Sequence, residues 1–169
     1  MSERSPAPGG LELVEALVNT LLDIGTGADS LDTPQARARF GLTEDDLPAA
    51  RELRESLRAT LLAHAGHPPH RPVTPLAELL AAAPLVVAVD PADGSAALVP
   101  ARDGTLVARV ATAVAQALVA GTWSRLKACE AADCHWAYYD RSPAGRGRWC
   151  SMQVCGARAK MRRYRAKDT

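Results

Sequence analysis

Apolar residues in the N-terminal part of the chain recur at the spacing of helix faces. The first stripe begins at Leu11 and returns every three or four residues, which predicts a helix ended by Gly25 and Gly27. The pair Thr33-Pro34 is typical of an N-cap followed by proline in the first turn. It predicts a second, short helix that stops near Gly41.

A longer helix is predicted from about Pro48 to Ala63, with an inner face formed by Leu53, Leu57 and Leu61. The proline-rich residues 65–72 are predicted to form a loop. A loop interrupted by prolines would not align its histidines on one face, so we interpret these as linker residues and not as metal ligands: His64, His67 and His70. The pair Thr74-Pro75 repeats the cap signal and predicts a short helix before Pro84.

The hydrophobic pattern then changes. Residues 85–89 and 96–100 are short apolar runs on either side of Asp93-Gly94, a pattern that predicts a β-hairpin. Helical spacing returns at Thr105 and could continue to Gly121 or to Lys127. The predicted fold class is α+β, with a mostly helical domain, one β-hairpin and a small C-terminal module that contains the cysteines.

Charge divides the chain into two parts, although the net charge of its 169 residues is only +1. Residues 1–120 contain 9 Lys or Arg and 15 Asp or Glu, whereas residues 121–169 contain 11 and 4. This asymmetry suggests that the basic part faces an anionic partner, and the alternative is that the two parts attract each other within the fold.

The beginning of the chain bears on its location. Residues 1–10 are polar and rich in proline and glycine, and we predict a disordered lead there. No apolar run resembles a signal peptide or reaches the length of a membrane span. We therefore expect a cytoplasmic protein whose thiols stay reduced.

The four cysteines form two close pairs, Cys129-x4-Cys134 and Cys150-x4-Cys155, with 15 residues between the pairs. Two such pairs can fold back to surround one tetrahedral ion, and zinc prefers four thiolates. Four protein ligands close the coordination sphere, so the pattern favours one structural Zn²⁺ per chain. The alternatives are two disulfides, an iron–sulfur cluster with an uncommon spacing, and four unrelated buried thiols.

The segment between the cysteine pairs is predicted to form a strand over residues 135–140 and a turn over residues 142–147. A module this small cannot bury enough apolar surface to be stable alone, so bound metal would supply much of its folding energy. The predicted organisation is a lead over residues 1–10, a helical α+β domain over 11–124, and a zinc module with a basic end over 125–169.

Two stretches around the cysteines resemble a known family. C-x4-C-x-W-x-Y-x-D-x-S from Cys129 and R-W-C-S-M-x-x-C-G-x-R-x-K from Arg148 resemble the CGNR zinc finger. The segments 11–21, 33–37 and 123–129 resemble the ABATE domain that usually precedes this finger. The resemblance implies a bacterial, stress-induced transcription regulator with a DNA-binding finger, and it places the four cysteines on the metal ligands.

The chain departs from the family at two positions. Tyr138 stands where the family usually has phenylalanine, and Ala157 replaces the asparagine of the C-G-N-R motif. Asparagine can read adenine or cap a helix, whereas alanine can do neither. The departure therefore bears on sequence-specific reading of DNA more than on zinc binding.

Basic residues concentrate around the second cysteine pair. They are the predicted nucleic-acid contacts: Arg146, Arg148, Arg158, Lys160, Arg162, Arg163 and Arg165. Such groups give salt-dependent affinity for phosphate without choice of sequence, and Trp149 and Tyr164 could stack on bases. DNA is the favoured partner. The alternatives are a solvated basic tail, an RNA-binding module and a protein-interaction finger that binds an acidic partner.

The chain shows no motif of a common catalytic site, and we expect a protein that is not an enzyme. The helical domain is a candidate sensor for a small-molecule effector, a hypothesis that rests on the two-part organisation. A homodimer is compatible with a DNA reader, although no sequence feature indicates an interface.

Overall fold

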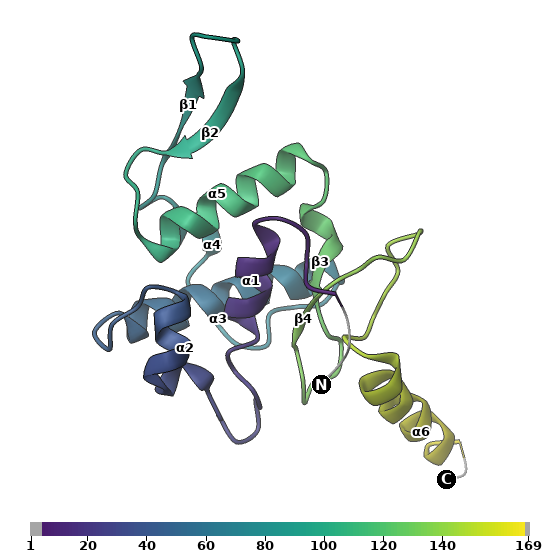
Figure 1. Ribbon diagram of the computed structural model, residues 1–169. Helices are drawn as coiled ribbons and strands as arrows, with labels where there is room; N and C mark the ends of the chain where they lie inside the picture. The colour runs from purple at the N-terminus through teal and green to yellow at the C-terminus, as the bar shows by residue number, and fades with distance from the viewer. Residues whose placement is uncertain (1–4, 168–169) are drawn as a thin grey trace.

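The computed structural model describes residues 5–167, and the mostly helical α+β fold class predicted from the sequence is confirmed (Figure 1). The N-terminal part contains α1 (Leu11–Val18), the 3₁₀ turn η1 (Ser30–Asp32), α2 (Pro34–Arg39), α3 (Leu47–His64), α4 (Leu76–Leu80) and α5 (Leu106–Val119). A hairpin of β1 (Leu85–Val89) and β2 (Ala96–Pro100) lies between α4 and α5. The C-terminal part contains the 3₁₀ turn η2 (Trp123–Arg125), β3 (Leu126–Ala128), β4 (Ala137–Tyr139), the π turn η3 (Met152–Gly156) and α6 (Ala157–Arg165).

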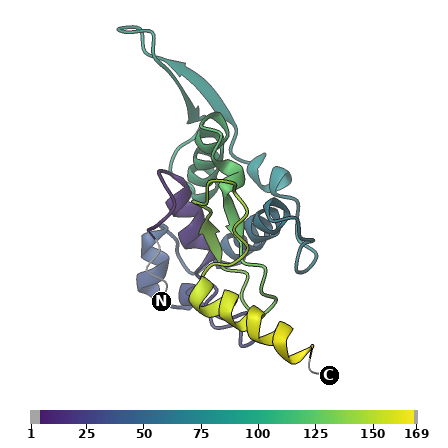
Figure 2. The same ribbon diagram turned by 90° about the vertical axis from the view of Figure 1, so that its right-hand side faces the viewer.

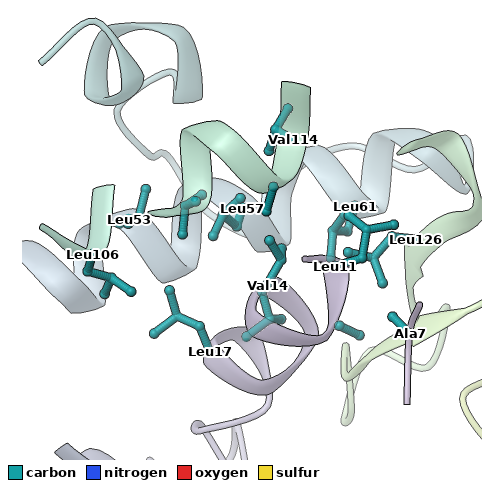
Figure 3. Close-up of a cluster of buried hydrophobic side chains, with 14 of the residues drawn as sticks. Ala7, Leu11, Val14, Leu17, Leu53, Leu57, Leu61, Leu106, Val114 and Leu126 are labelled. Atoms are coloured by element: carbon teal, nitrogen blue, oxygen red, sulfur yellow. The ribbon is translucent and has the colours of Figure 1, made fainter. Parts of the chain in front are cut away.

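The main core lies where α1, α3 and α5 pack together (Figure 3). The predicted inner face of α3 is buried, with Leu53 at 2% exposure and both Leu57 and Leu61 at 0%. The α5 helix begins as expected, because the Thr105 side chain accepts a hydrogen bond from the backbone N–H of Ala108. These helices bury apolar side chains along one face each, as their spacing predicts.

The first helix is shorter than predicted. It ends at Val18, and the chain then turns away, with the hydroxyl of Thr20 donating a 2.7 Å hydrogen bond to the carbonyl of Leu17. Leu21 then forms an isolated β-bridge with Asp29, while the side chain of Leu22 is half exposed. Thr74 also differs from its predicted role, since its hydroxyl bonds Glu52 instead of capping α4.

The predicted β1–β2 hairpin is present, with Leu85 paired to Pro100 and Val89 to Ala96. Residues 90–95 connect the strands, and Gly94 within this loop has a φ of 72°, which favours glycine. Figures 1 and 2 show the hairpin projecting from the helical body beyond α5, at the end of the molecule opposite α6.

A second antiparallel pair, β3 with β4, joins the cysteine-containing part to the helical part. Of these two strands, β4 falls within the predicted strand over residues 135–140, whereas β3 was not predicted from the sequence. Leu126 and Ala128 of β3 are fully buried in the main core, and β3 packs against α3. The "cysteine module", defined here as residues 125–167, therefore shares its apolar core with the helical domain.

Residues 5–10, within the predicted lead, contact the rest of the protein, while residues 1–4 lie outside the described part of the chain. Ala7 is buried, and its N–H donates a 2.6 Å hydrogen bond to the Glu15 carboxylate. The Arg141 guanidinium holds the carbonyls of Ser5 and Pro6. The contacts of Arg141 come from a distant part of the chain, so local composition does not reveal them.

Within residues 5–167, none of the helices combines the length and the apolar character that a membrane crossing requires.

Candidate metal centre and nucleic-acid interface

The structure brings the four cysteine sulfurs together. Cys129 follows β3, Cys134 lies in the turn before β4, Cys150 precedes η3, and Cys155 lies within η3. All four sulfurs lie within 4.8 Å of one another, with 3.6 Å separating Cys134 from Cys150 and Cys150 from Cys155. Ligands about 2.3 Å from a tetrahedral zinc ion lie about 3.8 Å apart, so these residues fit the ion.

Backbone hydrogen bonds hold the two cysteine loops against each other. The N–H of Cys129 donates to the carbonyl of Trp136 at 2.9 Å, and the N–H of Glu130 donates to the carbonyl of Arg148 at 3.0 Å. His135 adopts a φ of 50° in the turn, and its Nδ1 lies 3.0 Å from the carbonyl of Cys129. His135 thus contacts the backbone of a ligand residue and is not itself part of the thiol cluster.

The thiols differ in acidity because they are so close. Hydrogen bonds from the thiols of Cys134 and Cys150 lower the pKa of Cys129, so its thiolate forms readily. That thiolate accepts hydrogen bonds from the Cys134 and Cys150 thiols and opposes further negative charge, which raises the pKa of both Cys134 and Cys150. A divalent cation at the centre of the cluster would remove this opposition and displace the remaining protons.

Asp140 organises the loop over residues 141–148, which carries two of the predicted nucleic-acid contacts. Its carboxylate accepts hydrogen bonds from Lys127 Nζ at 3.0 Å, from the hydroxyl of Ser142 at 2.7 Å and from the N–H of Gly147 at 2.7 Å. Burial alone would raise the pKa of Asp140, but these donors outweigh burial and hold the pKa below its usual range. The sequence feature that could have indicated this buried ion pair is Lys127, which stands between the apolar residues Leu126 and Ala128 just before Cys129.

Arg58 of α3 ties the helical domain to the first cysteine loop. Its side chain is fully buried and donates to the carbonyl of His135 at 2.7 Å and to the carbonyl of Val18 at 2.8 Å. It also pairs with Glu55 at 3.0 Å. Burial would raise the pKa of Glu55, but a hydrogen bond from His70 and the charges of Arg58 and Arg54 hold it well below its usual range.

His67 and His70 lie in the predicted loop between α3 and α4, but all three histidines make contacts that a simple linker would not make. His64 lies at the end of α3, and its Nδ1 is 2.7 Å from the carbonyl of Leu126 in β3. His70 reaches back to Glu55 at 3.0 Å, and His67 lies 3.8 Å from Glu130 of the cysteine module. Two of these contacts cross from the helical domain to the module, where a sequence pattern cannot reveal them.

The predicted nucleic-acid residues divide into two groups. Arg148 forms a two-pronged ion pair with Glu130, and Arg158 pairs with Asp133 and donates a 3.2 Å hydrogen bond to the sulfur of Cys155. These two arginines therefore brace the metal centre. The remaining residues are exposed on the loop or on α6: Arg146, Lys160, Arg162, Arg163 and Arg165.

The ion pairs among described residues show whether the acidic and basic parts of the chain attract each other within the fold. Those of the arginines in α3 stay within the helical domain, and those of Lys127, Arg148 and Arg158 stay within the cysteine module. The charged side chains of α6 beyond Arg158 make no ion pair with another residue in the range 5–167, apart from an interaction of Arg165. The basic surface of α6 is thus directed mainly to solvent.

A cleft of about 710 Å³ lies between α6 and the segment that holds Trp149. Trp149 and Met152 form one apolar wall, and Lys160, Arg163 and Tyr164 of α6 contribute cationic and aromatic groups. We call this hollow the α6 cleft. Its combination of apolar and cationic walls suits a base with its phosphate, because bases stack on aromatic rings while Lys and Arg contact phosphate.

The fold and the site define a zinc-finger protein in which a helical α+β domain carries a four-cysteine metal site and a basic helix. Family comparison makes this specific: residues 11–121 match the ABATE model, described as "Putative stress-induced transcription regulator", and residues 125–168 match the CGNR zinc finger. The chain belongs to the ABATE family and ends in a CGNR zinc finger. Comparison with curated proteins gives no match.

Proposed function

We propose that the protein is a cytoplasmic, non-catalytic transcription regulator that binds DNA through its zinc finger. One structural Zn²⁺ per chain, held by the four cysteines, would fix the start of α6 and the loop over residues 141–148. The observation that carries the proposal is the exposed basic face of α6 directly after the last thiol of the metal centre. The family description of a transcription regulator supports the same reading.

Zinc would act here through folding and orientation. Its positive charge would stabilise four thiolates and hold η3 against the first cysteine loop. Arg158 would keep α6 in register with the centre, because its guanidinium contacts both the Cys155 sulfur and Asp133. With four protein ligands the ion has no open position for substrate, which supports a structural and not a catalytic role.

Affinity would come mainly from phosphate contacts by the exposed cations, so it should fall steeply with salt. The residues proposed for these contacts are Arg146, Lys160, Arg162, Arg163 and Arg165. Arg148 and Arg158 are proposed to act indirectly, by bracing the metal centre. An RNA or an acidic protein would meet the same surface, and a small-molecule effector of the helical domain and a homodimer are further parts of the proposal.

The test combines metal analysis with binding to duplex DNA and RNA over a range of salt. We expect one zinc per chain, loss of the metal in Cys150→Ser, and a slope of log K against log salt that falls by about 0.9 for each phosphate contact removed. The double variant Arg162→Ala/Arg163→Ala should reduce the slope, whereas the exposed Arg71→Ala in the helical domain is the matched control. No binding to duplex DNA at low salt would contradict DNA as the partner.

A further inference from the structure

The β1–β2 hairpin presents an apolar surface that the rest of the described chain leaves uncovered. All ten residues of the two strands are apolar: Leu85–Val89 and Ala96–Pro100. Val87 is 67% exposed and Val89 is 61% exposed, and at the end of α5 Val119 is 82% exposed. We define the hairpin surface as the two strands together with Val119.

A groove of about 410 Å³ separates the hairpin from the end of α5. Val87 and Leu98, which are paired across the strands, face it from the hairpin, and Val119 and Ala120 face it from α5. Gln116 is the polar side chain that lines it. The hairpin is covered only in part, where β2 contacts α5. A two-stranded hairpin with little of its surface covered is marginally stable in water, so burial of the exposed surface would stabilise the hairpin as well as the contact.

We propose that the chain forms a homodimer in which the hairpin surfaces of two copies pack against each other. The strands and the groove lack charged side chains, so an anionic or strongly polar partner would find no group to compensate the loss of its hydration. The surface fits a partner that is equally apolar, and a second copy presents such a surface. A two-fold contact uses the same patch on both copies.

The size of the surface reaches only the lower limit of a specific interface and fits a weak dimer contact. The exposed parts of Val86, Val87, Val89 and Val119, together with the alanines between them, amount to on the order of 500 Å² per copy, against roughly 800 Å² per partner in a standard interface. The outer backbone edges of β1 and β2 are also unpaired, since the described sheet contains these two strands alone. Strand edges pair readily with another chain.

The position of the hairpin is compatible with this dimer. Figures 1 and 2 show it at the end of the molecule opposite α6, with the helical body between them. Two copies joined through their hairpins would therefore leave both metal centres and both basic helices exposed. The hairpin contact specifies the homodimer that the proposed function includes, and its test is independent of nucleic-acid binding.

The test is sedimentation velocity of the full, zinc-loaded chain over a wide range of concentration. We expect the mass of two chains, shifting toward one chain on dilution. The variant Val87→Lys/Val89→Lys should weaken association by at least about 100-fold, because two cations would be buried without partners. Leu22→Lys is the matched control, since Leu22 is an exposed apolar residue in the loop after α1.

Both variants alter exposed side chains, and circular dichroism with zinc content checks that they still fold. Hydrogen exchange gives a second measurement: amides of residues 85–100 should exchange more slowly at high concentration than at low concentration. A single-chain mass at every concentration, or a dimer that persists unchanged in Val87→Lys/Val89→Lys, would overturn the proposal. A single-chain mass would indicate that any partner of the hairpin surface is a different apolar molecule and not a second copy.

Discussion

Replacing Arg58 with methionine tests whether the helical domain and the cysteine module unfold as one unit. Arg58 is fully buried, and its guanidinium reaches Glu55, the carbonyl of Val18 and the carbonyl of His135. The last of these contacts lies directly beside Cys134. Methionine fills a similar volume but donates no hydrogen bond, so Arg58→Met removes the link without creating a large cavity.

The expected loss of stability can be worked from these contacts. Breaking a buried ion pair costs about 3–5 kcal/mol, and each carbonyl left without a donor costs about 1–3 kcal/mol. The sum overstates the effect, because Arg54 and His70 still contact Glu55 in the variant. We expect a loss of about 3–4 kcal/mol, which corresponds to a fall of about 1.5–2 M in the urea midpoint for a slope of about 2 kcal/mol/M.

The assay is urea unfolding of the zinc-loaded protein, followed by circular dichroism for the helices and by zinc release for the cysteine module. In the unaltered protein both signals should change at the same urea concentration. In Arg58→Met both should move together to lower urea. Arg51→Met is the matched control, because Arg51 also pairs with acids but its side chain is 39% exposed, and it should lose at most about 1 kcal/mol.

Two results would refute this reasoning. The first is a loss in Arg58→Met no larger than that in Arg51→Met, which would mean that the buried contacts contribute little. The second is separate transitions in the unaltered protein, with zinc released before the helices unfold or after. Separate transitions would show that the shared core around β3 does not couple the two parts.

Three further changes should give distinct results. The pKa of Glu55 is depressed in the folded state, so its contribution to stability is present above the unfolded pKa of about 4.3 and is lost as the pH falls below that value. Glu55→Gln should therefore lower the free energy of unfolding at neutral pH. The same variant should also make that free energy, measured with urea, depend less on pH below neutrality. In Gly147→Ala the new Cβ would lie 2.8 Å from Asp140 Oδ1, so we expect a loss of about 1–3 kcal/mol in thermal unfolding, against about 0.5 kcal/mol or less for Gly25→Ala. Arg158→Lys keeps the charge but loses the fork that spans Asp133 and Cys155, so a chelator should remove zinc about 10-fold faster while the salt slope of DNA binding stays unchanged. Each prediction would be contradicted by one result: unchanged stability in Glu55→Gln, a loss in Gly147→Ala no larger than in Gly25→Ala, or a changed salt slope in Arg158→Lys.

The elements that could be predicted from the sequence are those whose signal is local. The α3 helix carries a leucine repeat, and the two strands of the hairpin are apolar runs on either side of an Asp-Gly pair. The metal site was predictable for a similar reason, since the spacing within each cysteine pair permits a tight turn. Such patterns need no knowledge of distant residues, and the structure has the corresponding elements within a few residues of the predicted bounds.

The features that the sequence reading missed depend on contacts between distant segments. Three residues of β3 are too few to show a strand period, and this strand is stabilised by pairing with β4 and by burial against α3. The early end of α1 likewise depends on the bridge between Leu21 and Asp29. An apolar stripe identifies the residues that are candidates for burial, but it does not say whether they lie on a helix or on the segment that follows it.

A count of basic residues likewise misses contacts between distant segments at the candidate nucleic-acid interface. Arg148 and Arg158 are as basic as their neighbours in the sequence, yet each has an acidic partner within the module. Their partners, Glu130 and Asp133, lie between the first two cysteines and reach the arginines only after the metal loops close. Two of the seven predicted basic residues thus contact acidic residues beside the metal centre, and the surface proposed to contact phosphate is smaller than the sequence suggests.

The residues that follow Cys155 have separate physical roles. Gly156 is buried in a helical conformation, and a Cβ there would lie 3.1 Å from Met152 Sδ and 3.3 Å from Trp149 Cδ1, so close packing, and not a positive φ, favours glycine at this position. Ala157 is exposed at the first position of α6 and lines the α6 cleft. A side chain larger than alanine at position 157 would extend from the lining of the cleft, whereas a larger residue at 156 would press against Met152 and Trp149. The replacement of asparagine by alanine therefore changes a residue that lines the α6 cleft, on the surface that we propose binds nucleic acid, and it does not alter any of the four cysteines.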